Sequence, residues 1–242
     1  TDRPEIFSNG RHWTIQPDAA TAQRIIERPA DTAGTTFRLP WAFDPQSAVR
    51  RALRLSVVQL DQLDDFAAQF SAAIGLAALF LRQIHTLEVR RNEALIHRLT
   101  RQISADGRIH LQDEHGRSAT WLLLHGDFAS EAAGLRAQYP WQIEDGRRSA
   151  IHIALPTTDL SAPGRFFAGL PTATTMPLPL HLNADFFPTT DRKRIHFDGG
   201  YQADWNHAAL RCAAQPLAEA LPALPAALGP AILWRLLGQM AH

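Results

Sequence analysis

Cysteine, net charge and long apolar runs are all scarce in this chain. The single cysteine, Cys212, excludes an internal disulfide and a multi-thiolate zinc site, and it suits a reducing cytoplasm. Lys plus Arg and Asp plus Glu number 24 each, so no net charge attracts the chain to nucleic acid or to an anionic membrane. The longest apolar run, residues 72–81, is too short to span a bilayer. We therefore expect a cytoplasmic protein with neither a nucleic-acid nor a membrane partner.

Signatures of metal and nucleophile chemistry are missing as well. Among eleven histidines, His110, His115, His125 and His152 show no metal-ligand spacing. Cys212 falls within a predicted helix, has no Asn or Asp at an activating distance, and is interpreted as buried packing. No G-x-S-x-G nucleophile elbow occurs, although a Ser/His/Asp arrangement assembled by the fold stays open. We expect no metal site.

The composition and the pattern of apolar residues predict a soluble α+β fold. Hydrophobic residues make up 45% of the 242 residues and charged residues 20%, which is enough to bury a core. A long half-buried helix is predicted over residues 60–81, because apolar residues recur there with a 3.6-residue period. Alternation then predicts four antiparallel strands, a meander packed on that helix, at residues 85–90, 94–102, 108–112 and 119–125.

Further elements complete the expected antiparallel or mixed sheet, with its helices on one side. A helix is predicted at residues 128–139, a strand at 147–155, and a helix at 203–215 that Asp204 caps and Pro216 ends. Near the beginning, Asn9-Gly10 indicates a turn, residues 19–27 have weak helical spacing, and residues 34–40 are typical of a strand. The chain starts without methionine, and we expect it to be a segment of a longer protein; processing of the N-terminus is the alternative.

Residues 164–206 combine the features expected of an anion-binding segment. Two short apolar runs, residues 165–170 and 178–187, flank a loop rich in Pro, Thr and Ala. A cationic cluster follows at Arg192, Lys193 and Arg194, and paired glycines then lead into a helix. Guanidinium groups match phosphate oxygens geometrically, and each such hydrogen bond contributes about 1.5–3 kcal/mol. A basic turn that only meets solvent is the alternative.

The same segment contains, in order, FF-x-x-LP, a polar loop, LP-x-H-x-N-x-x-F, a basic pair and D-W-N, and in this order it resembles the sacsin repeat region of sacsin and of related bacterial Hsp90-like proteins. Elements of that region recur in order over about forty residues. The matching residues are Phe166, Phe167, Leu170, Pro171, Leu178, Pro179, His181, Asn183, Phe186, Asp191, Arg192, Lys193, Trp205 and Asn206. The resemblance implies a fold like the Hsp90-like middle region. Trp205 is interpreted as a packing anchor at the start of its helix.

A shorter upstream segment, Gly34-Thr35-Thr36-Phe37-Arg38-Leu39-Pro40, resembles the last sequence box of the GHKL ATPase fold. In that family the Gly-Thr pair lies near the nucleotide phosphates, which would place Gly34, Thr35 and Thr36 at the cofactor. The resemblance implies that residues 1–43 are the end of an ATP-binding domain and that residues 44–242 are the following middle domain. The family's magnesium-binding, adenine-reading and lid motifs do not occur in the chain. ATP and Mg²⁺ are therefore expected in the longer protein, and none bound tightly to this chain.

Roles for individual residues follow from the resemblance. A middle-domain loop of Hsp90-like ATPases supplies an arginine to the terminal phosphate of ATP held by the preceding domain, and its two basic positions fall on Arg192 and Lys193. Asp191 and Arg194 depart from the family pattern, which leaves open which cation reaches the phosphate. Asn183 and His181 lie on one face of a predicted strand, where a solvent-facing polar surface is favoured over ligand contact.

Two functions remain open at this stage. The chain is either the coupling domain of a sacsin/Hsp90-like chaperone-type ATPase, with the upstream ATP-binding domain as its partner, or a scaffold module that binds a partner or client protein. An intact upstream ATP-binding domain would favour the first function. The sequence gives no indication of the client or of the oligomeric state.

Overall fold

The computed structural model describes residues 2–91, 93–158 and 162–240, and it divides the chain into two compact units. The first unit comprises Thr1–Gln69 and the second Phe70–His242. The border lies inside a helix, downstream of the boundary at residue 44 that the family resemblance implies. The assignment of residues 1–43 to an ATP-binding domain stays a prediction.

The first unit contains a four-stranded antiparallel sheet in the order β3-β2-β1-β4. Its strands are β1 Glu5–Ser8, β2 Arg11–Ile15, β3 Ile25–Pro29 and β4 Thr36–Arg38. Asn9 and Gly10 join β1 to β2 with positive φ angles of 50° and 73°, which a tight hairpin turn requires. The strand predicted at residues 34–40 is confirmed as β4. The helix predicted at 19–27 is wrong, because only the short 3₁₀ turn η1, Thr21–Gln23, precedes β3.

A short helix and a long one follow in the chain. Helix α1 spans Ala48–Leu53, and α2 spans Asp61–Ala77 before continuing as the 3₁₀ helix η2, Ala78–Phe80. The long helix is confirmed, but the predicted half-burial is wrong for most of its length, because Ile74 is its one fully buried described residue. By length and hydropathy alone, Leu60–Phe80 is long and apolar enough to span a membrane. A single helix of this kind is weak evidence for a membrane span, because core helices of soluble proteins meet the same criteria.

The second unit contains an eight-stranded sheet in the order β11-β10-β12-β9-β8-β7-β6-β5. Its strands are β5 Thr86–Arg91, β6 Ala94–Ile103, β7 Arg108–Asp113, β8 Ser118–Asp127, β9 Ala150–Pro156, β10 Gly164–Ala168, β11 Leu170–Met176 and β12 His181–Asn183. The predicted antiparallel meander β5–β8 is confirmed. Strands β10 and β12 pair in parallel, so the sheet is mixed. With 32% helix and 30% strand, the α+β class is confirmed.

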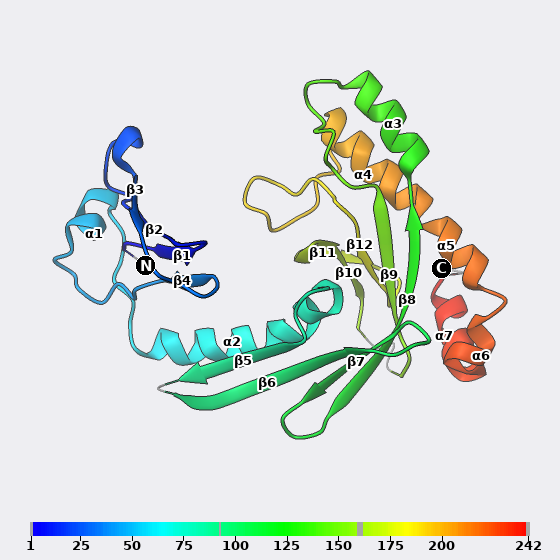
Figure 1. Ribbon diagram of the computed structural model, residues 1–242. Helices are drawn as coiled ribbons and strands as arrows, with labels where there is room; N and C mark the ends of the chain where they lie inside the picture. Colours follow the sequence, from blue (N-terminus) through cyan, green and yellow to red (C-terminus); the bar gives the residue numbers. More distant parts are fainter. Residues whose placement is uncertain (1, 92, 159–161, 241–242) are drawn as a thin grey trace. The chain divides into compact units, whose positions relative to one another are not determined.

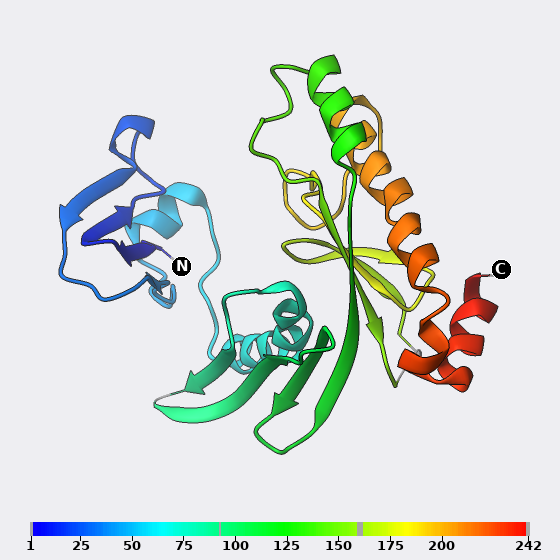
Figure 2. The same ribbon diagram turned by 45° about the vertical axis from the view of Figure 1, so that its right-hand side comes forward.

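Helices of the second unit pack mainly against β8 and β9. They are α3 Ala129–Gln138, α4 Gly200–Cys212, α5 Ala214–Ala220, α6 Leu224–Leu228 and α7 Pro230–Met240. Figures 1 and 2 show α3, α4 and α5 along one face of these strands. Two details of the prediction are wrong: α4 begins after Gly199 and encloses Asp204, and Pro216 lies inside α5. A proline is tolerated there because the first turn of a helix has no backbone hydrogen bonds to lose.

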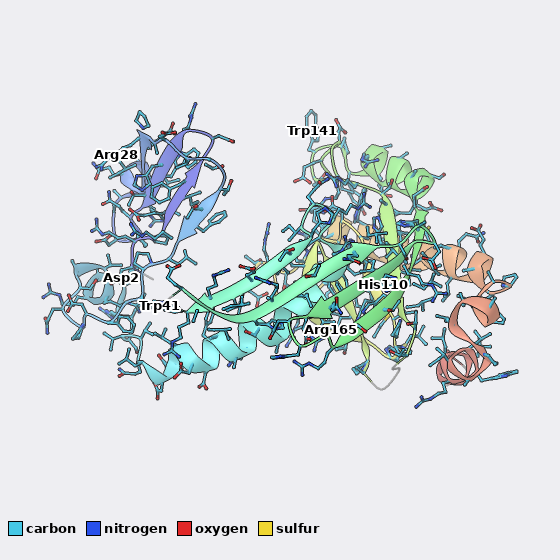
Figure 3. The ribbon with its side chains drawn as sticks, turned by 60° about the horizontal axis from the view of Figure 1, so that its bottom comes forward. Asp2, Arg28, Trp41, His110, Trp141 and Arg165 are labelled. Atoms are coloured by element: carbon cyan, nitrogen blue, oxygen red, sulfur yellow. The ribbon has the colours of Figure 1, made fainter. Side chains whose placement is uncertain are left out.

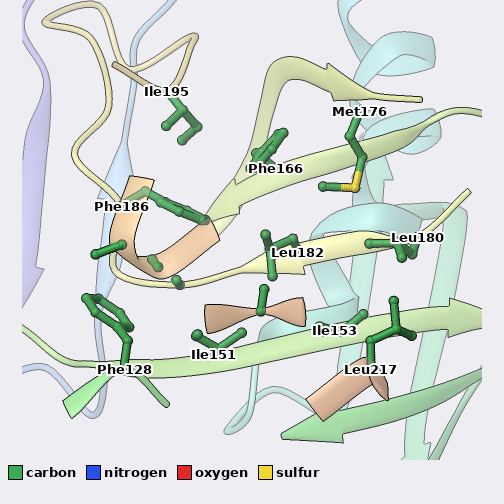
Figure 4. Packing of buried hydrophobic residues seen from close by; sticks show 14 of the residues in the cluster. Phe128, Ile151, Ile153, Phe166, Met176, Leu180, Leu182, Phe186, Ile195 and Leu217 are labelled. Atoms are coloured by element: carbon green, nitrogen blue, oxygen red, sulfur yellow. The ribbon is translucent and has the colours of Figure 1, made fainter. Parts of the chain in front are cut away.

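Apolar side chains cover both faces of this sheet. Ile151, Ile153 and Leu155 of β9 face the α3–α5 side, in a layer that Figure 4 shows from close by. Ala154 points the other way and packs with Ile74 and with residues of η2, β6 and β7. The strand alternation therefore places buried positions on both faces, with the end of α2 opposite α3–α5.

The chain between the two apolar runs of the central segment forms a strand rather than the expected loop. Residues 170–176 are β11, which pairs with β10 across Gly169, where φ is 80°. Thr172 is buried, and its hydroxyl donates to the carbonyl oxygen of Phe166 over 2.8 Å. Pro171 is tolerated because β11 is the edge strand of the sheet. The strand preference of the β-branched threonines thus outweighs the turn preference of the prolines.

Two glycine substitutions test this packing. A β-carbon at Gly164 of β10 would overlap the carbonyl oxygens of Leu178 and Leu180, whereas one at Gly134 of α3 meets only open space. We predict that Gly164→Ala lowers the free energy of unfolding by about 3 kcal/mol, as overpacking does. Gly134→Ala should raise it by about 0.5–1 kcal/mol, since alanine is the better helix former. Urea unfolding measures both, and equal effects would contradict the packing at Gly164.

Candidate functional site

The predicted cationic cluster lies on a hydrogen-bonded turn formed by residues 189–194, here called the basic turn. Pro188 and Ile195 pair at its base as an antiparallel bridge. Thr189 closes the turn: its amide donates to the carbonyl of Arg194 over 2.8 Å, and its hydroxyl donates to Asp191 over 2.6 Å. The Asp191 carboxylate also accepts from the amide of Lys193 at 3.1 Å. These bonds hold the turn in one shape without using the cationic side chains.

All three cationic side chains of the basic turn are exposed. Within the part of the chain that the structure describes, none of them forms an ion pair or donates a side-chain hydrogen bond. The bond from Thr189, helped by Lys193 and Arg194, lowers the pKa of Asp191, so its charge is kept at neutral pH. Arg192 has a left-handed φ of 57°, which costs a non-glycine residue about 1–2 kcal/mol. The turn therefore presents unpaired cations on a fixed backbone.

Strand β11 supports the basic turn from one side. The amide of Ala173 donates to the carbonyl of Lys193 over 2.6 Å, and the amide of Ile195 donates to the hydroxyl of Thr174 over 2.9 Å. Strand β11, which the sequence did not predict, therefore positions the basic turn and its cations.

Helix α4 supports the same turn through Asn206, which is completely buried. Its amide oxygen accepts from the backbone N–H of Phe187 over 2.8 Å. Its amide nitrogen donates to the carbonyls of Phe187 at 2.8 Å and His196 at 2.7 Å. The neighbouring Trp205 is buried as predicted and donates from its indole to the carbonyl of Asp185 over 3.0 Å. Both residues thus fix the chain on either side of the basic turn.

His181 and Asn183 do not form the solvent-facing surface that was favoured. His181 is buried, and its Nδ1 accepts from the amide of Arg165 over 3.0 Å. Burial, and then the charge of Arg165, lower its pKa from 6.5 to about 4. Asn183 is half-buried, and its side-chain oxygen accepts from the amide of Gly169, which orders the β10–β11 turn. The two side chains therefore stabilise β10, and Asn183 also lines a cleft described below.

Gly34, Thr35 and Thr36 belong to the first compact unit, whereas the basic turn belongs to the second. The three residues are exposed, and the Thr35 hydroxyl hydrogen-bonds that of Ser8 over 2.7 Å. Their role at a nucleotide phosphate stays a prediction.

A pocket of about 290 Å³ adjoins the basic turn and is lined by Arg192, Arg147 and Asp185, among others. Arg147 donates to the Asp185 carboxylate at 3.0 Å and stacks 3.6 Å above the ring of Phe187. Its charge is therefore compensated, whereas that of Arg192 is available. Arg147 and Asp185 had not been predicted, because no spacing in the sequence connects them.

Comparisons with known proteins give no relative from which a function could be transferred. No family model matches the chain, and neither the curated proteins nor the solved structures yield a match.

Removal of the Asn206 amide should loosen the fold around the basic turn. Asn206→Ala leaves the N–H of Phe187 and the carbonyl of His196 without partners, while the Phe187 carbonyl keeps its bond from the His196 amide, and we predict a loss of about 3 kcal/mol or more in the free energy of unfolding. Arg211→Ala, at an exposed position of the same helix, should change it by less than about 0.5 kcal/mol. Equal urea-unfolding midpoints for the two variants would show that Asn206 has no such role.

The buried His181 makes stability depend on pH. Because its folded pKa of about 4 lies below the ordinary 6.5, the unfolded chain binds the proton more tightly, and stability falls as the pH drops from 6.5 toward 4. We predict that His181 contributes about 2 kcal/mol of the loss between pH 7 and pH 5. His181→Asn keeps an acceptor at the same position and should reduce the loss of stability between pH 7 and pH 5 by this amount, whereas the exposed His85→Asn should not. Urea unfolding at pH 7 and pH 5 measures the loss. An equal loss of stability in the parent, His181→Asn and His85→Asn would refute the assignment of this loss to His181.

Proposed function

We propose that this chain is a phosphate-contacting coupling domain of a sacsin/Hsp90-like ATPase. In this proposal an upstream ATP-binding domain holds ATP and Mg²⁺, and the basic turn donates to the terminal phosphate. The observation that supports it is the unpaired state of Arg192, Lys193 and Arg194 on a turn whose backbone is held by β11 and α4. A preorganised cation stabilises developing charge without reorganisation at the moment of reaction.

The residues that carry the family resemblance divide into two groups in a way that supports this proposal. His181, Asn183, Trp205 and Asn206 all use their side chains on the protein's own backbone. Cations in the basic turn, by contrast, have no structural task in the described part of the chain. A side chain without an internal partner is the type expected to meet a ligand.

Among the three cations, Arg192 is the preferred candidate for the phosphate. It lines the pocket beside the turn, and Lys193 and Arg194 do not. Its guanidinium offers two parallel donors to phosphate oxygens, whereas the ammonium of Lys193 acts as a point charge. We therefore assign the direct contact to Arg192 and a supporting charge to Lys193.

A protein-binding scaffold is the second candidate, and exposed apolar side chains favour it. Ile25, Phe37 and Leu60 of the first unit are each more than half exposed. In the second unit Trp141 is 94% exposed and extends from the loop after α3, as Figure 3 shows. Aromatic side chains such as those of Phe37 and Trp141 are enriched where proteins meet.

ATP turnover by the protein that includes the upstream domain separates the two candidates. We predict that Arg192→Ala lowers kcat about 10- to 100-fold, because a charge-assisted bond of about 1.5–3 kcal/mol is lost in the transition state. Lys193→Ala should lower it less, and Arg211→Ala should leave it unchanged. Turnover within twofold of the parent for Arg192→Ala would reject the coupling function and favour the scaffold.

A thermal-shift titration with Mg-ATP provides the binding side of this test. The chain alone should show no shift, because most of the nucleotide site is expected upstream, whereas the longer protein should melt at a higher temperature. A shift of equal size in both proteins would contradict the divided site.

A further inference from the structure

A second, larger cavity lies in the same unit, and its polar lining contains two arginines and one carboxylate beside His, Asn and Gln side chains. This arginine cleft has a volume of about 870 Å³ and is lined by the loop after η2, the start of β9, the β10–β11 turn and the end of β12. Arg82 and Arg148 bring two guanidinium groups to it. Neither forms an ion pair within the described residues. A cavity of this size matches small-molecule sites, which commonly measure about 300–1,000 Å³.

The register of the sheet places a row of polar side chains in line with the cleft. His125 of β8 lies opposite His152 of β9, which lies opposite Asn183 of β12. Directly opposed residues share one face of a sheet, and this face continues into the apolar layer beneath η2. The polar row therefore borders a buried apolar layer, and two of its members, His152 and Asn183, line the cleft.

His152 fixes the position of Arg82. Its side chain is 8% exposed, and its Nε2 accepts a hydrogen bond from Nη2 of Arg82. Burial, and then the charges of Arg82 and His125, lower the pKa of His152 to about 4, so the ring is neutral and able to accept. One nitrogen of the guanidinium is thereby used for orientation, and the remaining donors of Arg82 stay available. The Nδ1 of His152 has no protein partner among the described residues.

Asp185 is the one carboxylate that lines the cleft among the described residues, and its charge is already compensated. One oxygen accepts from Arg147 at 3.0 Å and the other from the backbone amide of Arg148 at 3.0 Å. The side chains of Arg82 and Arg148 thus keep their positive charges without an internal counter-ion. A bound anion is the partner that such a pair lacks.

We propose that the arginine cleft binds a small organic phosphate, with the phosphate between Arg82 and Arg148 and the organic part against Ile84 and Leu170. Phosphate fits better than carboxylate because the available donors, two guanidinium groups and the amide nitrogen of Asn183, exceed what a planar carboxylate accepts. Ile84 and Leu170 are exposed apolar residues that line the same cavity and offer a surface to the organic part. The site is separate from the basic turn and does not depend on its role.

Calorimetric titration of the whole chain with phenyl phosphate tests the proposal, and inorganic phosphate serves as the second probe. Saturable binding of phenyl phosphate is expected, with weaker binding of inorganic phosphate, which has no apolar part. Arg82→Gln and Arg148→Gln should each weaken phenyl phosphate binding about tenfold or more. Both positions are exposed, so the variants should keep the parent's circular dichroism and melting temperature.

Two further variants decide where the phosphate binds. Arg211→Gln makes the same charge change on an exposed helix position away from the cleft, and Arg192→Gln makes it in the basic turn; both should retain affinity within twofold. The absence of saturable binding, or equal losses for Arg82→Gln and Arg211→Gln, would overturn the proposal. A tenfold loss for Arg192→Gln with none for Arg82→Gln would also overturn it and place the anion at the basic turn.

Discussion

The buried amide of Asn206 is the interaction on which the arrangement of the cationic segment depends. Its oxygen and nitrogen bond to backbone groups on both sides of the basic turn, at Phe187 and His196. No water reaches this position, so a lost bond is not replaced, and each unpaired group would cost about 1–3 kcal/mol. The helix, the two chain segments and the basic turn between them are therefore constrained to move together.

Arginine has two different uses in this molecule. Arg50 bonds Asp2 at 2.7 Å in the first unit, and Arg147 bonds Asp185 in the second, so both hold the fold. Arg82, Arg148 and Arg192 instead line cavities, and within the described residues none of them pairs with a carboxylate. Lys193 is the only lysine among the 24 cationic residues, so arginine as a residue type gives no information about which side chains act. Only their partners in the fold separate the structural arginines from the available ones.

Strongly periodic elements could be predicted from the sequence because one physical signal decides each of them. The meander β5–β8 and the long α2 follow from apolar alternation and from the helical period. Strand β11 could not be predicted, because Pro171 and the threonines are typical of a turn. Proline is acceptable in this strand only because β11 lies at the edge of the sheet, and the sequence does not show that position. The burial of His181 was missed for a similar reason: its acceptor role depends on Arg165 in the neighbouring strand.

The candidate sites show the same division between local and long-range information. The basic turn was found in the sequence because its cations are consecutive. The arginine cleft was not, because Arg82, Arg148 and Asn183 meet only through the register of β8, β9 and β12 and the loop after η2. Signals carried by one segment are visible in a sequence, whereas sites assembled by strand pairing need the structure.

The β10–β11 turn connects the two cationic sites physically. Ala168 and Leu170 line both the arginine cleft and the pocket beside Arg192. The same hairpin continues into β11, which holds the basic turn through the backbone amide of Ala173 and the side-chain hydroxyl of Thr174. A shift of the hairpin would therefore reach the basic turn directly through these two bonds. Since packed interiors transmit strain rather than absorb it, the hairpin is the element through which one site would influence the other.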